Sequence, residues 1–208
     1  MPFKDKGRKQ LMIILASASP RRTEILGALG VEHTVFTANA DESSEITDPH
    51  ALTEELARRK GLAVYEELRT NPLFAVDLDD TVIISADTVV YADRKILGKP
   101  RDPDNALEML RSLSGRSHEV ISGVAVTVGG VTKSASCSTK VFVDEIPEEE
   151  LVAYANSGEP LDKAGAYAIQ GHFSVWISSI EGCYFNVVGL PVNLLNRLYF
   201  EAVGKYLI

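Results

Sequence analysis

Cysteine and tryptophan are scarce in this sequence: the 208 residues include 2 cysteines and 1 tryptophan. Cys137 and Cys183 are far apart in the chain and form no C-x-x-C pair. Two such cysteines favour buried, reduced thiols, with a disulfide as the alternative. The chain also lacks an N-x-S/T acceptor site for glycosylation. Both features favour a cytoplasmic location.

Long apolar runs and an excess of positive charge are missing too. No stretch approaches the ~20 apolar residues of a membrane-spanning helix, so we expect no membrane partner. Asp and Glu total 29 against 21 Lys and Arg, which gives a formal net charge of −8. A general nucleic-acid binder would carry a basic surface, so we expect no nucleic-acid partner. Any anionic ligand must therefore be held by a local cluster of cations.

The length and the 45% content of hydrophobic residues suit a folded chain that needs no covalent cross-links. Residues 1–10 are basic and lack the pattern of a secretion signal, so we expect a disordered extension rather than a targeting segment. Residues 11–208 are expected to form a single domain or one elongated unit with two lobes. The sequence contains no internal repeat that would suggest another organisation.

The first clear unit is a strand followed by a helix. Residues 11–15 form an apolar run typical of a buried strand, and Ser19-Pro20 supplies an N-cap and a first helical residue. Arg21 and Arg22 then fall in the first helical turn, where the helix dipole is already positive. Cations are favourable there if an anion binds, so the unit predicts a phosphate site. Alternatively, both arginines are solvated or pair with an acid such as Glu24.

Asp87 is the strongest single functional candidate on physical grounds. It lies between two apolar β segments, residues 81–85 and 89–91. Burying a carboxylate there is costly unless it is paired or bound to a cation. A structural aspartate that caps a turn between the two segments is the alternative.

A long helix is expected over about residues 49–69, opened by an N-cap and a proline at Asp48-Pro49. Its charged stretch, Arg58 to Lys60, is expected to be mostly on the solvated face. Lys60 is nevertheless close in helical phase to the buried stripe, so its side chain could reach along the wall of a cleft.

Strands alternate with helices along the chain, which predicts an α/β fold with a mixed twisted sheet flanked by helices. Gly129-Gly130 predicts a hairpin between two long strands. Further strands are expected at residues 31–37 and 173–180. His118 is expected to be structural rather than catalytic.

Five short motifs follow one another along the chain: SASPRR at 17–22, SADT at 85–88, GKP at 98–100, DKAGAY at 162–167 and NVVGLP at 186–191. Together they resemble the Maf family, also called septum formation inhibitor proteins, over nearly the whole chain from about Leu11. The resemblance implies an elongated α/β fold with a central cleft between two lobes, similar to the inosine triphosphate pyrophosphatases. It also implies a homodimer, which many members form.

The resemblance implies a nucleoside triphosphate pyrophosphatase that requires a divalent metal cation, Mg²⁺ or Mn²⁺. Water attacks the α-phosphorus and gives a nucleoside monophosphate and pyrophosphate. Arg21, Thr88 and Gln170 stand at the three positions that separate the dTTP/UTP group from the 7-methyl-GTP group, in which a tryptophan replaces the first arginine. The sequence therefore resembles the dTTP/UTP group.

Within this resemblance, each polar residue has an expected role. The residues expected to hold the phosphates are Ser17, Arg21, Arg22, Lys60 and Lys99. Asp87 is expected to activate the attacking water or to bind the metal, and Glu42 is the expected second carboxylate ligand. The amide of Gln170 can match the edge of uracil or thymine. Two alternatives remain: a nucleotide-binding regulator of cell division without turnover, and a 7-methyl-GTP pyrophosphatase.

Overall fold

The protein is described by a computed structural model that covers residues 11–74 and 76–208. The extension expected at residues 1–10 lies outside the described residues. The fold is a seven-stranded mixed sheet of order β2-β1-β3-β5-β6-β7, with β4 paired to β3. The strands are β1 (Met12–Leu15), β2 (Thr34–Val35), β3 (Thr81–Ala92), β4 (Lys95–Leu97), β5 (Ser117–Val128), β6 (Val131–Val143) and β7 (Ile177–Glu181). The expected α/β class with a mixed sheet is confirmed.

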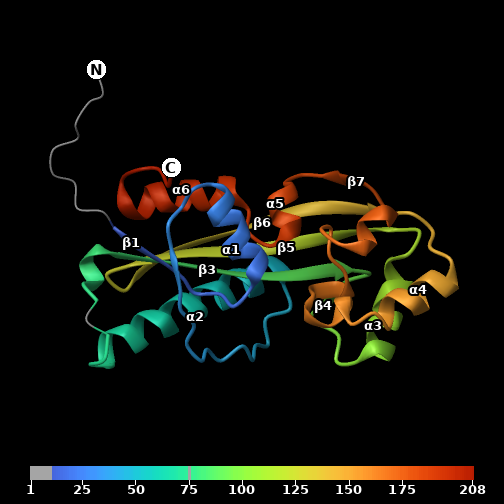
Figure 1. Ribbon diagram of the computed structural model, residues 1–208, viewed down its shortest axis with the longest axis horizontal. Helices are drawn as coiled ribbons and strands as arrows, with labels where there is room; N and C mark the ends of the chain where they lie inside the picture. The colour runs from blue at the N-terminus through green and yellow to red at the C-terminus, as the bar shows by residue number, and fades with distance from the viewer. Residues whose placement is uncertain (1–10, 75) are drawn as a thin grey trace, which may run out of the picture.

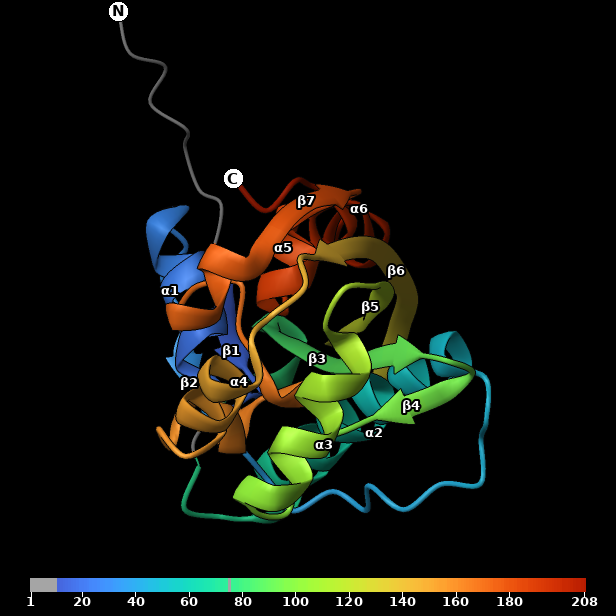
Figure 2. The same cartoon turned by 90° about the vertical axis from the view of Figure 1, so that its right-hand side faces the viewer.

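Helices lie on both faces of this sheet (Figure 1). The α-helices are α1 (Pro20–Ala28), α2 (Pro49–Thr70), α3 (Pro103–Leu113), α4 (Glu148–Ala155), α5 (Tyr184–Val188) and α6 (Val192–Val203), and the 3₁₀ turns are η1 (Leu78–Asp80), η2 (Glu159–Asp162), η3 (Ala164–Ala166) and η4 (His172–Trp176). Helix α2 covers β3, β5 and β6 on one face, and α6 packs on β5 and β6 from the other. Helices α3 and α4 pack together at one end of the molecule, seen end-on in Figure 2. Among the described helices, none has both the length and the apolar character needed to cross a membrane.

Strand β3 runs without interruption through three clusters of buried side chains, the third of which includes Ile83. Val82 and Ile84 pack with α1 and α6 in the first cluster, whereas Val90 packs with α3 and α4 in the second. Its composition, rich in Val, Ile and Thr, suits a strand covered on both faces. Asp87 lies between these two parts of β3, so the alternative in which it caps a turn is wrong.

Local sequence signals set several element boundaries as predicted. The side chain of Asp48 accepts a hydrogen bond from the amide of Ala51 at 2.8 Å and caps α2. Gly129 and Gly130 both adopt positive φ in the turn of the β5–β6 hairpin, which confirms that prediction. Helix α1 begins at Pro20 as predicted, although the Ser19 side chain makes no capping hydrogen bond.

Two sequence-based expectations need correction. The strand expected at 31–37 shrinks to β2, because the chain at Val31 instead wraps the end of α1 through a hydrogen bond to Leu26. The first part of the strand expected at 173–180 is the turn η4, in which Phe173 is buried without pairing to a strand. The NVVGLP motif at 186–191 begins inside the short helix α5.

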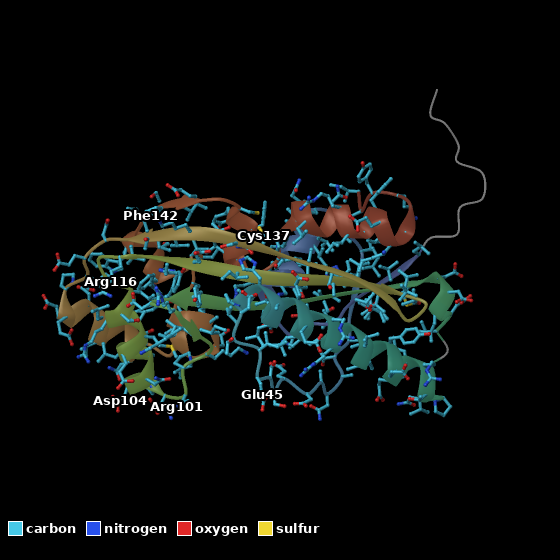
Figure 3. All side chains as sticks on the ribbon, turned by 180° about the vertical axis from the view of Figure 1, so that it is seen from behind. Glu45, Arg101, Asp104, Arg116, Cys137 and Phe142 are labelled. Carbon is cyan, nitrogen blue, oxygen red and sulfur yellow. The ribbon has the colours of Figure 1, made fainter. Side chains whose placement is uncertain are left out.

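The two cysteines are free, as the sequence suggested, but both are half-buried rather than buried. Cys137 lies on β6, on the side of the sheet that also carries α5 and α6 (Figure 3). Cys183 precedes α5, and its amide and carbonyl both hydrogen-bond to Thr139 Oγ1. Burial raises the pKa of the Cys137 thiol, which keeps it in its protonated, less reactive form.

Candidate functional site

A single cleft of about 800 Å³ lies between the β1–α1 turn, α2, the middle of β3 and the turns η2 and η3. All nine residues singled out from the sequence line it: Ser17, Arg21, Arg22, Glu42, Lys60, Asp87, Thr88, Lys99 and Gln170. They come from six separate segments of the chain. The fold therefore brings every predicted site residue to one place.

Arg22 is buried at the base of the cleft, where its guanidinium joins three segments. Its Nη1 donates to Ser17 Oγ at 2.9 Å and to the carbonyl of Ala86 at 2.8 Å. Its Nε donates to the carbonyl of Gly189 at 2.8 Å, and its Nη2 donates to Thr88 Oγ1 at 3.2 Å. Burial lowers the pKa of Arg22 to about 10, which still leaves it charged at neutral pH. The alternative of a solvated Arg22 is wrong.

Asp87 and Lys60 meet across the cleft wall that α2 forms against β3. Lys60 Nζ donates to Asp87 Oδ1 at 2.5 Å and lies 3.3 Å from Glu42 Oε1. The side chain of Asp87 is 13% exposed and that of Lys60 is 20% exposed. The ammonium group compensates the cost of placing the carboxylate in this half-buried position. The prediction that Lys60 reaches along a cleft wall is confirmed.

The opposite wall holds two residues to which sequence reasoning gave no role, Asp162 and Lys163. Arg21 Nη1 lies 3.3 Å from Asp162 Oδ2, an ion pair that crosses the cleft from α1 to η2. Lys163 Nζ donates to Asp162 Oδ1 at 2.6 Å. Burial would raise the pKa of Asp162, but hydrogen bonds and charge from Lys163 and Arg21 outweigh it and hold that pKa below its usual value. The DKAGAY motif, which contains Asp162 and Lys163, was the sequence signal that could have identified these two residues.

The rest of the cleft is completed by loop residues. Lys99 and Gln170 are both exposed at its rim. The amide of Gly165 donates to the carbonyl of Gly98 at 3.0 Å and so fixes the backbone beside Lys99. Gly165 has φ +67 and lies so close to Val90 that a Cβ would fall 2.6 Å from its side chain. Only glycine suits this position of the DKAGAY motif.

The electrostatic character of the cleft is opposite to that of the whole chain. Its lining carries five cationic side chains, Arg21, Arg22, Lys60, Lys99 and Lys163, against three carboxylates, Glu42, Asp87 and Asp162. The net charge of the complete chain is −8. The expected local cluster of cations is present, and it suits a ligand with several negative charges.

The carboxylates of the cleft fit a metal ion that also binds the ligand's phosphates. Within the described residues, no group of three or more His, Cys, Asp or Glu side chains is placed to hold an ion. Glu42 and Asp87, however, both place an oxygen within 3.3 Å of the same Lys60 Nζ. Mg²⁺ is commonly held by one or two carboxylates, with phosphates and water completing its shell. This donor set fits such an ion.

His118 lies outside the cleft lining and packs in the second core cluster. It is buried, and its Nε2 lies 2.6 Å from the hydroxyl of Tyr167. Its Nδ1 has no hydrogen-bond partner among the described residues. Burial lowers the pKa of His118 to about 4, so the imidazole is neutral at physiological pH. This environment agrees with the structural role expected for His118.

The fold and the cleft define an α/β protein built to bind a polyphosphate beside a carboxylate. The chain matches the family model described as Maf-like protein over residues 12–202, and it belongs to the Maf family. It is 44% identical to a dTTP/UTP pyrophosphatase of Clostridium beijerinckii, over 92% of this chain and 99% of the relative. It is 42% identical to a protein of the same name from Thermococcus kodakarensis, over 93% of this chain and 100% of the relative. The family resemblance seen in the motifs is confirmed.

Proposed function

We propose that this protein is a nucleoside triphosphate pyrophosphatase that converts dTTP and UTP to the nucleoside monophosphate and pyrophosphate. The observation that carries the proposal is the contact of Lys60 with Asp87 and Glu42 in a cleft that also holds Arg21 and Arg22. The names of the relatives, each a dTTP/UTP pyrophosphatase, support the same activity.

In this reaction a water oxygen bonds to the α-phosphorus while the bond from that phosphorus to the bridging oxygen breaks. Asp87 accepts the proton of the water, because its carboxylate is on a rigid strand inside the cleft. Lys60 donates a hydrogen bond to Asp87 and faces the phosphates. Arg21 and Lys99 bind the triphosphate and stabilise the charge that develops on the leaving pyrophosphate. Ser17 and Arg22 complete the phosphate site at its base.

Glu42 and Asp87 are the residues that would hold a divalent cation, Mg²⁺ or Mn²⁺. When bound, the cation neutralises phosphate charge and makes a water more acidic. Lys60 contacts both carboxylates in the protein alone, where its charge offsets theirs.

Three residues are proposed to select the base: Arg21, Thr88 and Gln170. The Gln170 amide carries a donor and an acceptor, which match the N3–H and carbonyl edge of uracil or thymine. Thr88 is fixed by hydrogen bonds from Arg22 at 3.2 Å and with Ser122 at 2.8 Å. The ion pair with Asp162 places Arg21 at the cleft. A tryptophan in place of Arg21, as in the 7-methyl-GTP group, could not form this pair.

We also propose that residues 11–208 act as one unit with two lobes in the cytoplasm. Strand β3 contributes to all three core clusters of the described residues, which supports a single unit. The two cysteines are free thiols, which are typical of a reducing compartment.

Pyrophosphate release from a panel of nucleotides tests the proposal. We expect turnover of dTTP and UTP with Mg²⁺ or Mn²⁺, and little turnover of 7-methyl-GTP. Turnover of 7-methyl-GTP alone would overturn the assignment of the base. Tight binding of dTTP and UTP by calorimetry, without any product, would overturn the assignment as an enzyme.

A further inference from the structure

Glu42 is presented by a loop that has no helix or strand of its own. This Glu42 loop, residues 36–48, connects β2 to α2 and runs along the outer edge of the molecule, where Glu45 is labelled in Figure 3. The side chain of Glu42 is 62% exposed, and its carboxylate lies 3.3 Å from Lys60 Nζ. A carboxylate so exposed is held in place only if its backbone is held.

Arg59 supplies that anchor from the adjoining position on α2. Its Nη1 donates to the carbonyl of Ser43 at 2.7 Å and to the carbonyl of Asp41 at 3.2 Å. These two carbonyls flank Glu42 on either side. The carboxylate of Asp41 also accepts hydrogen bonds from the Ser43 amide at 2.9 Å and the Ser43 hydroxyl at 2.6 Å. Glu42 therefore sits at the centre of a tight turn fastened to α2.

Glu55, which lies one helical turn before Arg59, holds the Arg59 side chain in place. Arg59 Nε donates to Glu55 Oε1 at 2.7 Å, and this bond is the main reason that the pKa of Glu55 lies below its usual value. The planar guanidinium thus bonds to the helix through one edge and to the loop through another. The Arg59 side chain is 30% exposed, so it lies at the margin of the solvated face and still contacts the loop.

We propose that Arg59 is a positioning residue, which fastens the turn at Asp41–Ser43 so that the Glu42 carboxylate faces Lys60 and Asp87. The part of this proposal that concerns a divalent cation rests on the proposed function, whereas the fastening of the loop does not. Arg59 and Lys60 are consecutive on α2, so the same helix positions both the Glu42 loop and the lysine. The metal-binding carboxylate is thereby coupled to the helix that also carries the lysine.

Arg58 provides a matched control from the same helix. It forms hydrogen bonds of 2.9 Å to both oxygens of Glu55, and within the described residues these bonds keep it on α2 rather than on the loop. Arg58→Met and Arg59→Met each remove one guanidinium and one ion pair to Glu55. They differ in whether the loop loses its anchor.

Hydrogen–deuterium exchange of the metal-free protein tests the fastening directly. Arg59→Met should speed exchange of peptides from the Glu42 loop by about tenfold, because local opening becomes easier. Arg58→Met should leave that exchange unchanged, and both variants should keep the circular dichroism of the unaltered protein. Unchanged loop exchange in Arg59→Met would overturn the proposal.

Binding of Mn²⁺ alone, measured by electron paramagnetic resonance without nucleotide, tests the consequence for Glu42. We expect Arg59→Met to weaken Mn²⁺ binding by about tenfold, as loss of a supporting residue commonly does. Glu42→Gln should weaken it as much while keeping the loop protected from exchange. A loosened loop with unchanged Mn²⁺ affinity would overturn the role of Arg59 toward Glu42. If the unaltered protein neither binds Mn²⁺ nor hydrolyses nucleotides, the proposed function fails, and the exchange result still decides the fastening.

Discussion

The two carboxylates proposed to act at the cleft are held in very different ways. Asp87 is on the central strand β3, with 13% of its side chain exposed, whereas Glu42 is on a loop with 62% exposed. A group that takes a proton must keep its geometry to a fraction of an ångström, which a strand achieves better than a loop. This contrast favours Asp87 over Glu42 as the proposed proton acceptor.

Replacing Asp87 with asparagine keeps the shape of the side chain and removes its ability to accept a proton. We expect kcat for dTTP to fall by about 10²–10⁴-fold, the usual contribution of a general base. Steady-state kinetics with each nucleotide provide the measurement. Asp93→Asn, in the exposed turn after β3, is the matched control and should keep normal kcat. A near-normal kcat in Asp87→Asn would mean that another group takes the proton.

Among the elements, helix α2 determines the geometry of the cleft because it crosses the sheet at very short range. A Cβ at Gly123 on β5 would lie 2.2 Å from the carbonyl oxygen of Thr53 on α2. A Cβ at Gly61 would lie 2.8 Å from Ser85 Oγ on β3. Gly123 pairs directly with Asp87 in the β3–β5 register. The absence of side chains at the two glycines lets α2 approach closely enough for Lys60 to reach Asp87.

Gly123→Ala should therefore damage both stability and activity. The added methyl group meets backbone rather than a movable side chain, so we expect a loss of about 1–3 kcal/mol or more in the free energy of unfolding. Urea denaturation measures the loss, and the nucleotide assay should show a lower kcat. Gly27→Ala on α1 is the control: nothing lies within 4 Å of its Cβ position. That variant should gain roughly 0.5–1 kcal/mol, because alanine favours a helix. Equal stability of the two variants would contradict the close crossing.

Elements governed by local sequence were predictable, and those governed by packing were not. The cap at Asp48 correctly predicted the start of α2, and the turn at Gly129-Gly130 correctly predicted the β5–β6 hairpin. Phe173 suggested a strand by its composition, but it packs between Tyr154 and Tyr167, at ring-centroid distances of 5.3 and 4.9 Å, and needs no strand partner.

The residues of the site divide in the same way, into those predictable from the sequence and those that required the fold. The cations of the motifs converge on the cleft as predicted. Asp162 pairs with a residue 141 positions away, and Arg59 bonds to carbonyls 16 and 18 positions away. Neither contact has a periodicity or a spacing that a single sequence reveals, so both required the fold.

For the molecule as a whole, a buried histidine links stability to pH. His118 packs within the second core cluster and has a pKa lowered to about 4 by burial, against about 6.5 in an unfolded chain. Between these values the unfolded chain binds a proton that the folded protein does not. His118 therefore contributes its full stabilisation above about pH 6.5. As the pH drops toward 4, the free energy of unfolding falls by about 3 kcal/mol because of this group.

His118→Phe should flatten this pH dependence, because phenylalanine retains an aromatic ring and binds no proton. The free energy of unfolding from urea titrations at pH 7, 6, 5 and 4.5 gives the comparison. We expect the difference between the unaltered protein and the variant to shift in favour of the variant as the pH falls. Parallel curves over this range would show that His118 does not couple protonation to folding.

The continuity of β3 from the first core cluster to the second has a consequence for how substrate enters and product leaves. Enzymes whose two halves are joined by a linker can open like a hinge, but here the halves share a strand that would have to bend at Asp87 itself. The carboxylate thus sits in the middle of a continuous strand rather than at a hinge. Access must be governed by the rims, namely the Glu42 loop on one side and the Arg21–Asp162 ion pair on the other. The rate of product release is then set by parts of the chain that can change without disturbing the chemistry.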